Sequence, residues 1–295
     1  MKNLLLAAYK PKNISSNHFL NKLKARVGEK KAGYSGTLDP FASGLLVVGF
    51  GQYTRLLPYL QLTPKCYKAT LWLGASSPTL DIEGIESVCQ IAPFSQTQVL
   101  EALDSLKGEV SYTPPRFSAK HINGTRAYKL AREGVEFALE TDTMSVYEIT
   151  LCAYNHPFLS FEVSVSKGAY VRSLGEIIAQ KLGVDGVLSA LHRISEGSIS
   201  LLSPTQPLYH IEIDSVCYPF FVLDSQKALS CPSLWLPKHK HLIANGAKFS
   251  LQNTKSGVYK TYFEEFFSII EVLANKEVRY LYNRIPYADT LEKTR

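Results

Sequence analysis

The sequence predicts an α+β fold built on a mainly antiparallel sheet. Two segments, 65–73 and 159–165, alternate apolar with polar residues, as half-buried strands do. Two other segments, 19–27 and 171–182, place apolar residues at helical spacing. Strands and helices do not alternate regularly along the chain, and this disfavours a parallel sheet made of βαβ units.

The N-terminal segment predicts a strand followed by a short basic helix. The apolar stretch within residues 1–10 is too short for a signal peptide, so we expect a first strand there. Ser15, Ser16 and Asn17 are good helix N-caps, and the helix is expected to end near Gly28. Three basic side chains flank its apolar stripe: Lys22, Lys24 and Arg26.

The middle of the chain predicts two further helices around an irregular segment. Residues 99–106 have helical apolar spacing and are closed by Gly108. Residues 112–117 contain paired prolines, which block both helix and sheet hydrogen bonds. A short helix is expected over 128–132.

The composition changes near residues 231–237, and short strands separated by turns follow. Strands are predicted over 258–263, 266–273 and 278–282. We therefore expect two parts, a larger domain over residues 1–234 and a small β-rich domain over 235–295.

Composition excludes several classes of protein. No apolar run approaches the roughly 20 residues that a membrane-spanning helix needs. The five cysteines form no C-x-x-C pair and have no neighbouring histidine cluster, which disfavours both zinc and a disulfide framework. An odd number of free thiols suits a reducing compartment, so we expect a cytoplasmic protein.

The positive charge of the chain is concentrated near its N-terminus. The whole chain carries +6, but residues 1–70 hold eleven Lys and Arg against two acidic residues, a net charge of +9. Such a surface suits a polyphosphate partner. A solvated lysine-rich face is an equally good explanation of the charge alone.

Residues 36–44 form a stiff loop around one carboxylate, Asp39. Gly36 and Gly44 permit tight backbone geometry, and Pro40 restricts the backbone of Asp39. An immobilised carboxylate is suited to act as a nucleophile. An ordinary Asp-Pro turn explains the same spacing.

Two further residues complement Asp39. Tyr67 lies on a predicted strand between Lys65 and Lys68, where a ring could stack on an unpaired base or face an apolar core. Arg172 lies in the first turn of a predicted helix, where the helix dipole disfavours a cation. We therefore expect Arg172 to have a carboxylate or phosphate partner.

Taken together, the motifs resemble those of the TruB family of tRNA pseudouridine synthases. The resemblance is dense over residues 4 to about 200. It rests on five stretches: Gly36-Thr37-Leu38-Asp39-Pro40-x-Ala42-x-Gly44, Lys65-x-Tyr67-Lys68, Pro114-Pro115-x-Phe117, Ser166-Lys167-Gly168-x-Tyr170-x-Arg172 and Leu191-His192-Arg193-Ile194. From residue 235 onward it is weaker, and His241–Gly246 is similar to the start of a PUA domain.

The resemblance implies a fold, a reaction and a set of site residues. The fold implied is the pseudouridine synthase fold, a mixed, mainly antiparallel sheet flanked by helices and loops, with a small β-rich PUA-like C-terminal domain. The reaction implied is isomerisation of uridine 55 in the T loop of tRNA, with Asp39 as nucleophile. The implied substrate-binding residues are Tyr67, Tyr170, Arg172 and Leu191, and the implied RNA-binding residues are Lys10, Tyr34, Lys65, Lys68 and Lys167.

The resemblance also implies that tRNA, through its T arm, is the partner. It implies no metal, no cofactor, no membrane and no obligatory protein partner, and a monomer. Two other functions stay open, a pseudouridine synthase for another RNA and a non-catalytic tRNA-folding chaperone.

The chain departs from the family pattern at several positions. Tyr34 replaces a histidine and Phe117 replaces a tyrosine. Asp81 aligns with an acidic residue beside the site, and the apolar character of 78–80 predicts a thin polar network around it.

Overall fold

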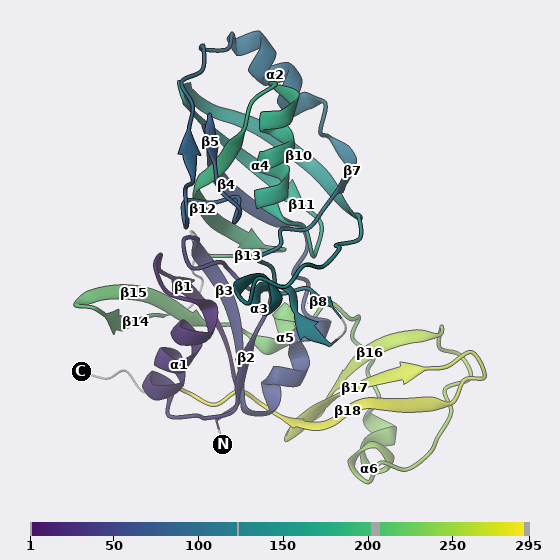
Figure 1. Cartoon of the computed structure of the whole chain (residues 1–295). Coiled ribbons are helices and arrows are strands. Elements are labelled where there is room, and N and C mark those ends of the chain that lie inside the picture. The colour runs from purple at the N-terminus through teal and green to yellow at the C-terminus, as the bar shows by residue number, and fades with distance from the viewer. Residues whose placement is uncertain (1, 123, 202–206, 292–295) are drawn as a thin grey trace.

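The computed structural model describes residues 2–122, 124–201 and 207–291 and is built around one large sheet (Figure 1). Within these residues eleven strands join, in the order β14-β15-β1-β3-β12-β4-β11-β10-β7, with β2 beside β3 and β13 beside β12. The strands are β1 (Leu4–Lys10), β2 (Ala32–Tyr34), β3 (Ser43–Phe50), β4 (Lys65–Leu73), β7 (Gly108–Tyr112), β10 (Asp142–Asn155), β11 (Phe158–Val165), β12 (Gly186–Glu196), β13 (Ile199–Ser200), β14 (Leu208–Ile213) and β15 (Val216–Val222).

The sheet is mixed and mainly antiparallel, as predicted. Among the described ladders of this sheet, only β3 and β12 run parallel, with His192 opposite Ser43 and Arg193 opposite Gly44. This short parallel contact joins the half that contains β1, β14 and β15 to the half that contains β4, β10 and β11. Segments about 150 residues apart therefore meet at the centre of the sheet.

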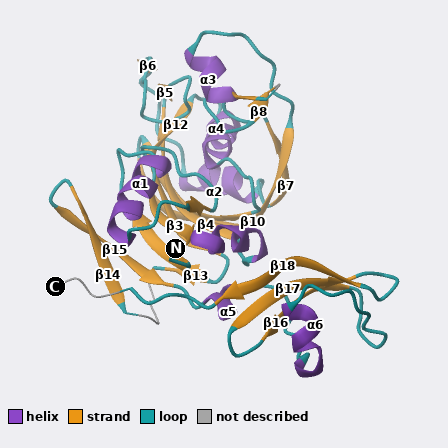
Figure 2. Ribbon diagram, turned by 90° about the horizontal axis from the view of Figure 1, so that it is seen from below, coloured by secondary structure: helices purple, strands orange, loops and turns teal. Residues whose placement is uncertain are grey.

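Most helices lie beside this sheet or in the loops between its strands, and the last one, α6, lies against the C-terminal strands (Figures 1 and 2). They are α1 (Ser16–Val27), η1 (Gly51–Tyr59), α2 (Gln96–Asp104), α3 (Ala127–Arg132), α4 (Val171–Lys181), α5 (Ser225–Ala228), η2 (Pro237–His239) and α6 (Lys240–Ala244). The first helix begins and ends as predicted. The Ser15 hydroxyl accepts a hydrogen bond from the His18 amide, and Gly28 ends the helix with φ +75°.

Three smaller sheets complete the structure. They pair β5 (Ala75–Ser76) with β6 (Ser87–Val88), β8 (His121–Ile122) with β9 (Thr125–Arg126), and β16 (Gly257–Tyr262) with β17 (Phe266–Val272) and β18 (Val278–Pro286). The last of these forms the predicted β-rich C-terminal part, which extends from one side of the molecule in Figure 2. No helix within the described residues is both long and apolar enough to cross a membrane.

The C-terminal sheet shares a hydrophobic core with the central sheet. Leu5 of β1 and Leu45 of β3 belong to the same buried cluster as Phe267 of β17 and Ile285 of β18. The chain then returns to the N-terminus, where the Asp289 amide donates to the Asn3 carbonyl at 3.0 Å. Residues 232–234 already pair with Lys260 of the C-terminal sheet, and the division into two domains after residue 234 stays a prediction.

The shared core generates a prediction about stability. Phe267 is fully buried and packs edge-on against Tyr53, with ring centroids 6.2 Å apart. Replacing Phe267 with alanine should lower the free energy of unfolding by about 3–5 kcal/mol, because it leaves a cavity. Urea unfolding followed by circular dichroism measures this loss, and Phe158→Ala, at a side chain that is 41% exposed, is the control. Equal losses in the two variants would contradict the shared core.

Candidate active site

The loop that carries Asp39 connects β2 to β3 and is fixed at several backbone atoms. The hydroxyl of Ser16 donates to the Leu38 carbonyl at 2.8 Å and accepts from the Leu38 amide at 2.9 Å. The Asn13 amide donates to the Pro40 carbonyl at 2.8 Å. Leu38 is buried, whereas the Asp39 side chain keeps 32% of its surface exposed. The carboxylate is therefore accessible on a rigid loop.

Two glycines allow this loop to approach its neighbours closely. Gly36 has φ +55°, and a Cβ there would collide with the amine of Lys65. Gly44 has φ +111°, and a Cβ there would collide with the backbone of Arg193 in the parallel contact. These two positions, predicted to give a tight loop, are tight because buried side chains and a neighbouring strand press against them.

Lys10 supports the same loop from inside and corrects an expectation. Its ammonium group donates to the carbonyls of Pro11 at 2.8 Å, Ala42 at 2.6 Å and Pro40 at 3.4 Å. The side chain is fully buried, so the expected RNA contact is wrong for Lys10. Burial lowers the pKa of Lys10 to about 8, and the Asp39 carboxylate opposes this shift.

Arg172, at the start of α4, is the direct partner of Asp39. Its Nε lies 2.8 Å from Oδ2 of Asp39, and its Nη1 lies 3.3 Å from Oδ2 of Asp81. Nη1 also donates to the Thr79 carbonyl at 2.7 Å, and Nη2 donates to the Phe117 carbonyl at 2.9 Å. The side chain is only 3% exposed. The expected carboxylate partner of Arg172 is confirmed. Phe117 contributes through its backbone carbonyl, so having phenylalanine in place of the family's tyrosine does not affect this contact.

The polar network around Asp81 is denser than predicted. Oδ1 of Asp81 accepts from the Thr79 hydroxyl at 2.7 Å and from the Glu83 amide at 2.9 Å. The hydroxyls of Ser77 and Thr79 lie 2.8 Å apart. The expectation of a thin network is therefore wrong, because Thr79 and backbone groups supply contacts that the apolar neighbours cannot. Asp81 in turn holds Arg172 in place.

Opposing effects act on the ionisation of Asp39. Burial raises the pKa of its carboxyl above the ordinary aspartate value, Arg172 opposes this, and Asp81 raises the pKa further. Lys10 also opposes the rise. The pKa of Asp39 is therefore raised overall, and the Arg172 guanidinium is the strongest of the groups that favour the carboxylate form.

The structure brings the predicted apolar walls together around this loop. Tyr67 of β4 and Leu191 of β12 are 7% and 5% exposed and share a buried cluster with Leu38. Tyr170 is half-buried and packs against that cluster. Its ring lies 6.1 Å from that of Tyr112. Their roles in substrate binding remain predictions.

The other lysines expected to contact RNA differ in their exposure to solvent. Lys65 is 7% exposed and its ammonium group is 2.8 Å from Glu196, so the expected RNA contact is wrong there. Lys68 is exposed, but strand alternation directs it to the face opposite Tyr67. Lys167 is exposed just before α4.

Tyr34 lies at the end of β2, opposite Val48, and is partly exposed. Its ring packs against the apolar cluster beneath α1. A contact between Tyr34 and RNA remains a prediction.

Two charged residues near the site were not anticipated. Arg193 and Glu196 are 1% and 0% exposed, and both lie on β12. Side chains alternate between the two faces of a strand, so Arg193 points the same way as the apolar Leu191. The sequence therefore contained a signal that Arg193 is buried. A register shift between Arg193 and Ser195 then breaks the alternation, so the inward position of Glu196 was not readable.

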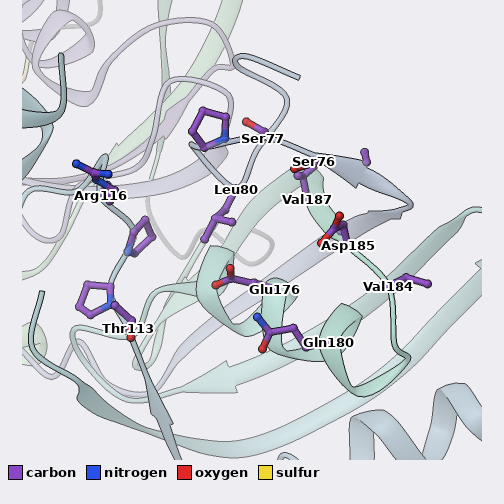
Figure 3. A pocket seen from close by; sticks show the side chains of 15 residues that line it. Ser76, Ser77, Leu80, Thr113, Arg116, Glu176, Gln180, Val184, Asp185 and Val187 are labelled. Atoms are coloured by element: carbon purple, nitrogen blue, oxygen red, sulfur yellow. The ribbon is translucent and has the colours of Figure 1, made fainter. Parts of the chain in front are cut away.

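A cavity of about 360 Å³ lies beside α4, and Asp39 is not among the residues that line it (Figure 3). Glu176 and Gln180 of α4 line it together with Leu80 and Thr113. The Thr113 carbonyl accepts from the Ser173 hydroxyl at 2.8 Å, so the cavity borders the loops that support Arg172. Among the described residues no group of three or more His, Cys, Asp or Glu is placed to hold a metal ion.

Comparison with known proteins adds a family and a fold. The N-terminal domain model of the TruB family pseudouridylate synthases matches residues 24–171. A tRNA pseudouridine synthase B of Helicobacter hepaticus is 54% identical, over 99% of this chain and 99% of that protein. One of Sulfurovum sp. is 47% identical, over 98% and 99%. In the archaeal box H/ACA sRNP Nop10-Cbf5 complex, a chain with 17% identity has a TM-score of 0.64, covering 96% of this chain and 86% of that one. That structure is similar in fold.

The buried ion pairs of Arg172 generate a prediction. Arg172→Met should lower the free energy of unfolding by about 3–5 kcal/mol, because it leaves the Asp81 carboxylate, 4% exposed, without its cation. Urea unfolding at neutral pH measures this change. Lys120→Met removes a partly exposed pair with Asp142, at 3.1 Å, and should cost less than about 1 kcal/mol. If both variants unfold at the same urea concentration, Arg172 is not the anchor of the site.

Proposed function

We propose that this chain, which belongs to the TruB family of pseudouridylate synthases, uses Asp39 as the nucleophile that converts uridine 55 in the T loop of tRNA to pseudouridine. As a member of this family the chain is an isomerase that makes pseudouridine in tRNA. The observation that supports the role of Asp39 is its ion pair with Arg172, at 2.8 Å, on a loop fixed from several sides.

Reaction requires the target base to leave the folded T loop. A base inside a stacked loop is out of reach of a carboxylate, so the nucleotide must flip into the site. Tyr67 then offers a ring for stacking, while Tyr170 and Leu191 supply apolar walls. Exclusion of water by these walls protects the cleaved intermediate from hydrolysis.

The chemistry exchanges one bond for another. Asp39 attacks the base or the ribose, and the bond between N1 and C1′ breaks. Uracil turns within the pocket and its C5 bonds to C1′, and the bond that Asp39 formed to the ribose or the base breaks, which releases the carboxylate. The hydrogen on C5 leaves as a proton and N1 gains a proton. The product is therefore an isomer of the substrate, and the reaction needs no oxidant or reductant. Arg172 keeps Asp39 ionised for the attack, and Tyr67 assists removal of the C5 proton.

Recognition of tRNA would combine phosphate contacts with shape. The positive charge concentrated in residues 1–70 suits the RNA backbone. Lys167 is an exposed cation on the loop just before Arg172, and Tyr34 is a partly exposed ring on the strand that leads to the Asp39 loop. We propose that the chain acts on the T arm as a monomer in the cytoplasm, without an obligatory protein partner.

Substitution of Asp39 tests the proposed nucleophile. In Asp39→Ala, release of tritium from C5-labelled uridine in a T-arm hairpin should fall at least about a thousandfold, because the attacking group is absent. Binding of the hairpin should change less than about threefold, since phosphate contacts carry the affinity. Asp104→Ala, at a side chain that is 62% exposed, is the matched control and should retain activity.

The outcomes separate the proposal from its alternatives. Normal turnover by Asp39→Ala would remove Asp39 as the nucleophile. A wild-type protein that folds tRNA but releases no tritium would be a non-catalytic chaperone. Pseudouridine that appears in another RNA and not in tRNA would change the substrate.

The pH dependence of kcat/KM tests the ionisation of Asp39. Activity needs the carboxylate, so it should be lost as pH falls through the pKa of Asp39. Because burial and Asp81 raise that pKa, the acidic limb should lie above the ordinary aspartate value of 3.8. Rates with the T-arm hairpin across acidic pH, with folding checked by circular dichroism, measure the limb. A limb at or below 3.8 would contradict the raised pKa.

A further inference from the structure

A buried ion cluster lies beside the Asp39 loop and outside the chemistry described so far. Glu196 is fully buried and has three partners. The Lys65 ammonium is 2.8 Å from Oε2, the Arg193 guanidinium is 3.0 Å from Oε1, and the Ser35 hydroxyl is 2.8 Å from Oε2. Breaking such a cluster leaves an uncompensated buried charge, which is costly. The cluster therefore holds its members in one arrangement.

Arg193 links this cluster to both the nucleophile loop and Tyr67. Its Nε donates to the Leu45 carbonyl at 2.7 Å, and its Nη2 donates to the Gly36 carbonyl at 3.1 Å. Gly36 is three residues before Asp39. Across the sheet, Arg193 of β12 lies opposite Tyr67 of β4, so the two side chains share the buried face and the positive charge of the guanidinium acts on the phenol. One rigid cation thus links Tyr67 to the loop that carries Asp39.

The cluster places a surplus cation beside the Tyr67 phenol. Lys65 and Arg193 contribute two cations and Glu196 contributes one anion. Burial raises the pKa of Tyr67, Arg193 acts to lower it, and Glu196 and Asp39 act to raise it. The net effect is a raised pKa for Tyr67, and the surplus cation reduces the cost of the phenolate that forms when the phenol gives up its proton.

We infer that Arg193 is a positioning residue for the Tyr67 phenol, held by Glu196, and that it acts on removal of the C5 proton. This inference rests on the proposed pseudouridine synthase activity. After C5 has bonded to C1′, C5 still carries its hydrogen and N1 is doubly bonded to C6. The Tyr67 hydroxyl gives its proton to a water molecule, its oxygen takes the C5 proton, the freed electron pair forms the C5–C6 double bond, and N1 takes a proton from that water. No electron is gained or lost overall.

Arg193→Lys tests this role because it keeps the positive charge but loses the planar fork. One ammonium cannot contact Leu45, Gly36, Glu196 and the phenol together. We expect pseudouridine formation from a uridine hairpin to slow about tenfold, the effect of one lost hydrogen bond to a charged group. A 5-fluorouridine hairpin cannot lose fluorine as a cation, so it reports only the steps up to formation of the C5–C1′ bond. Formation of its C-linked product should change less than about twofold.

The ratio of the two rates does not depend on how much of the variant is folded. Equal slowing of both substrates would overturn the inference, because Arg193 would then act structurally or on an earlier step. An unchanged uridine rate would overturn it as well. A wild-type protein that converts neither substrate would contradict the proposed function itself, which is a separate result.

Glu196→Gln provides a second variant that keeps the shape of the side chain. It should show the same selective slowing of the uridine hairpin, by about threefold, because Arg193 loses its charged anchor. Glu162→Gln is the matched control, since Glu162 is exposed and pairs in register with Lys68 on the other face of the sheet. Equal rate ratios in the wild type and Glu196→Gln would remove Glu196 from the proposed support.

Discussion

The arrangement of the site depends on one buried cation, the guanidinium of Arg172. It pairs with Asp39 at 2.8 Å and with Asp81 at 3.3 Å, and it is 3% exposed. A buried guanidinium is stable only when its donors are used, and here backbone carbonyls from two loops complete its contacts. The folding of those loops and the ionisation of Asp39 are therefore parts of the same electrostatic arrangement.

A second constraint is the short parallel contact between β3 and β12. It brings Arg193 against Gly44, directly after the Asp39 loop, and leaves no room for a side chain at residue 44. The antiparallel pairing of β12 with β4 then carries Tyr67 to the same place. Sheet register thus sets the relation between Asp39 and the Tyr67 phenol, and a one-residue slip would turn Tyr67 to the opposite face.

Local patterns were sufficient for the predictions that depend on neighbouring residues. The helix from Ser16 to Gly28, the alternating strands and the need of Arg172 for a carboxylate follow from spacing and from the helix dipole. Local patterns did not predict the burial of two lysines. Lys10 and Lys65 look like RNA contacts in sequence, yet both are buried, because their partners lie about 30 and 130 residues away along the chain. Only the sheet topology reveals those partners.

The charges around the loop suit a reaction in which negative charge develops on the base. Four cations lie there, Lys10, Lys65, Arg172 and Arg193, against four carboxylates, Asp39, Asp81, Glu83 and Glu196. Cleavage of the bond between N1 and C1′ leaves uracil as an anion, which cations fixed in place stabilise without reorganisation. Each of these cations is held by carbonyl or carboxylate contacts within the fold, so folding has already met the cost of orienting them before the substrate arrives.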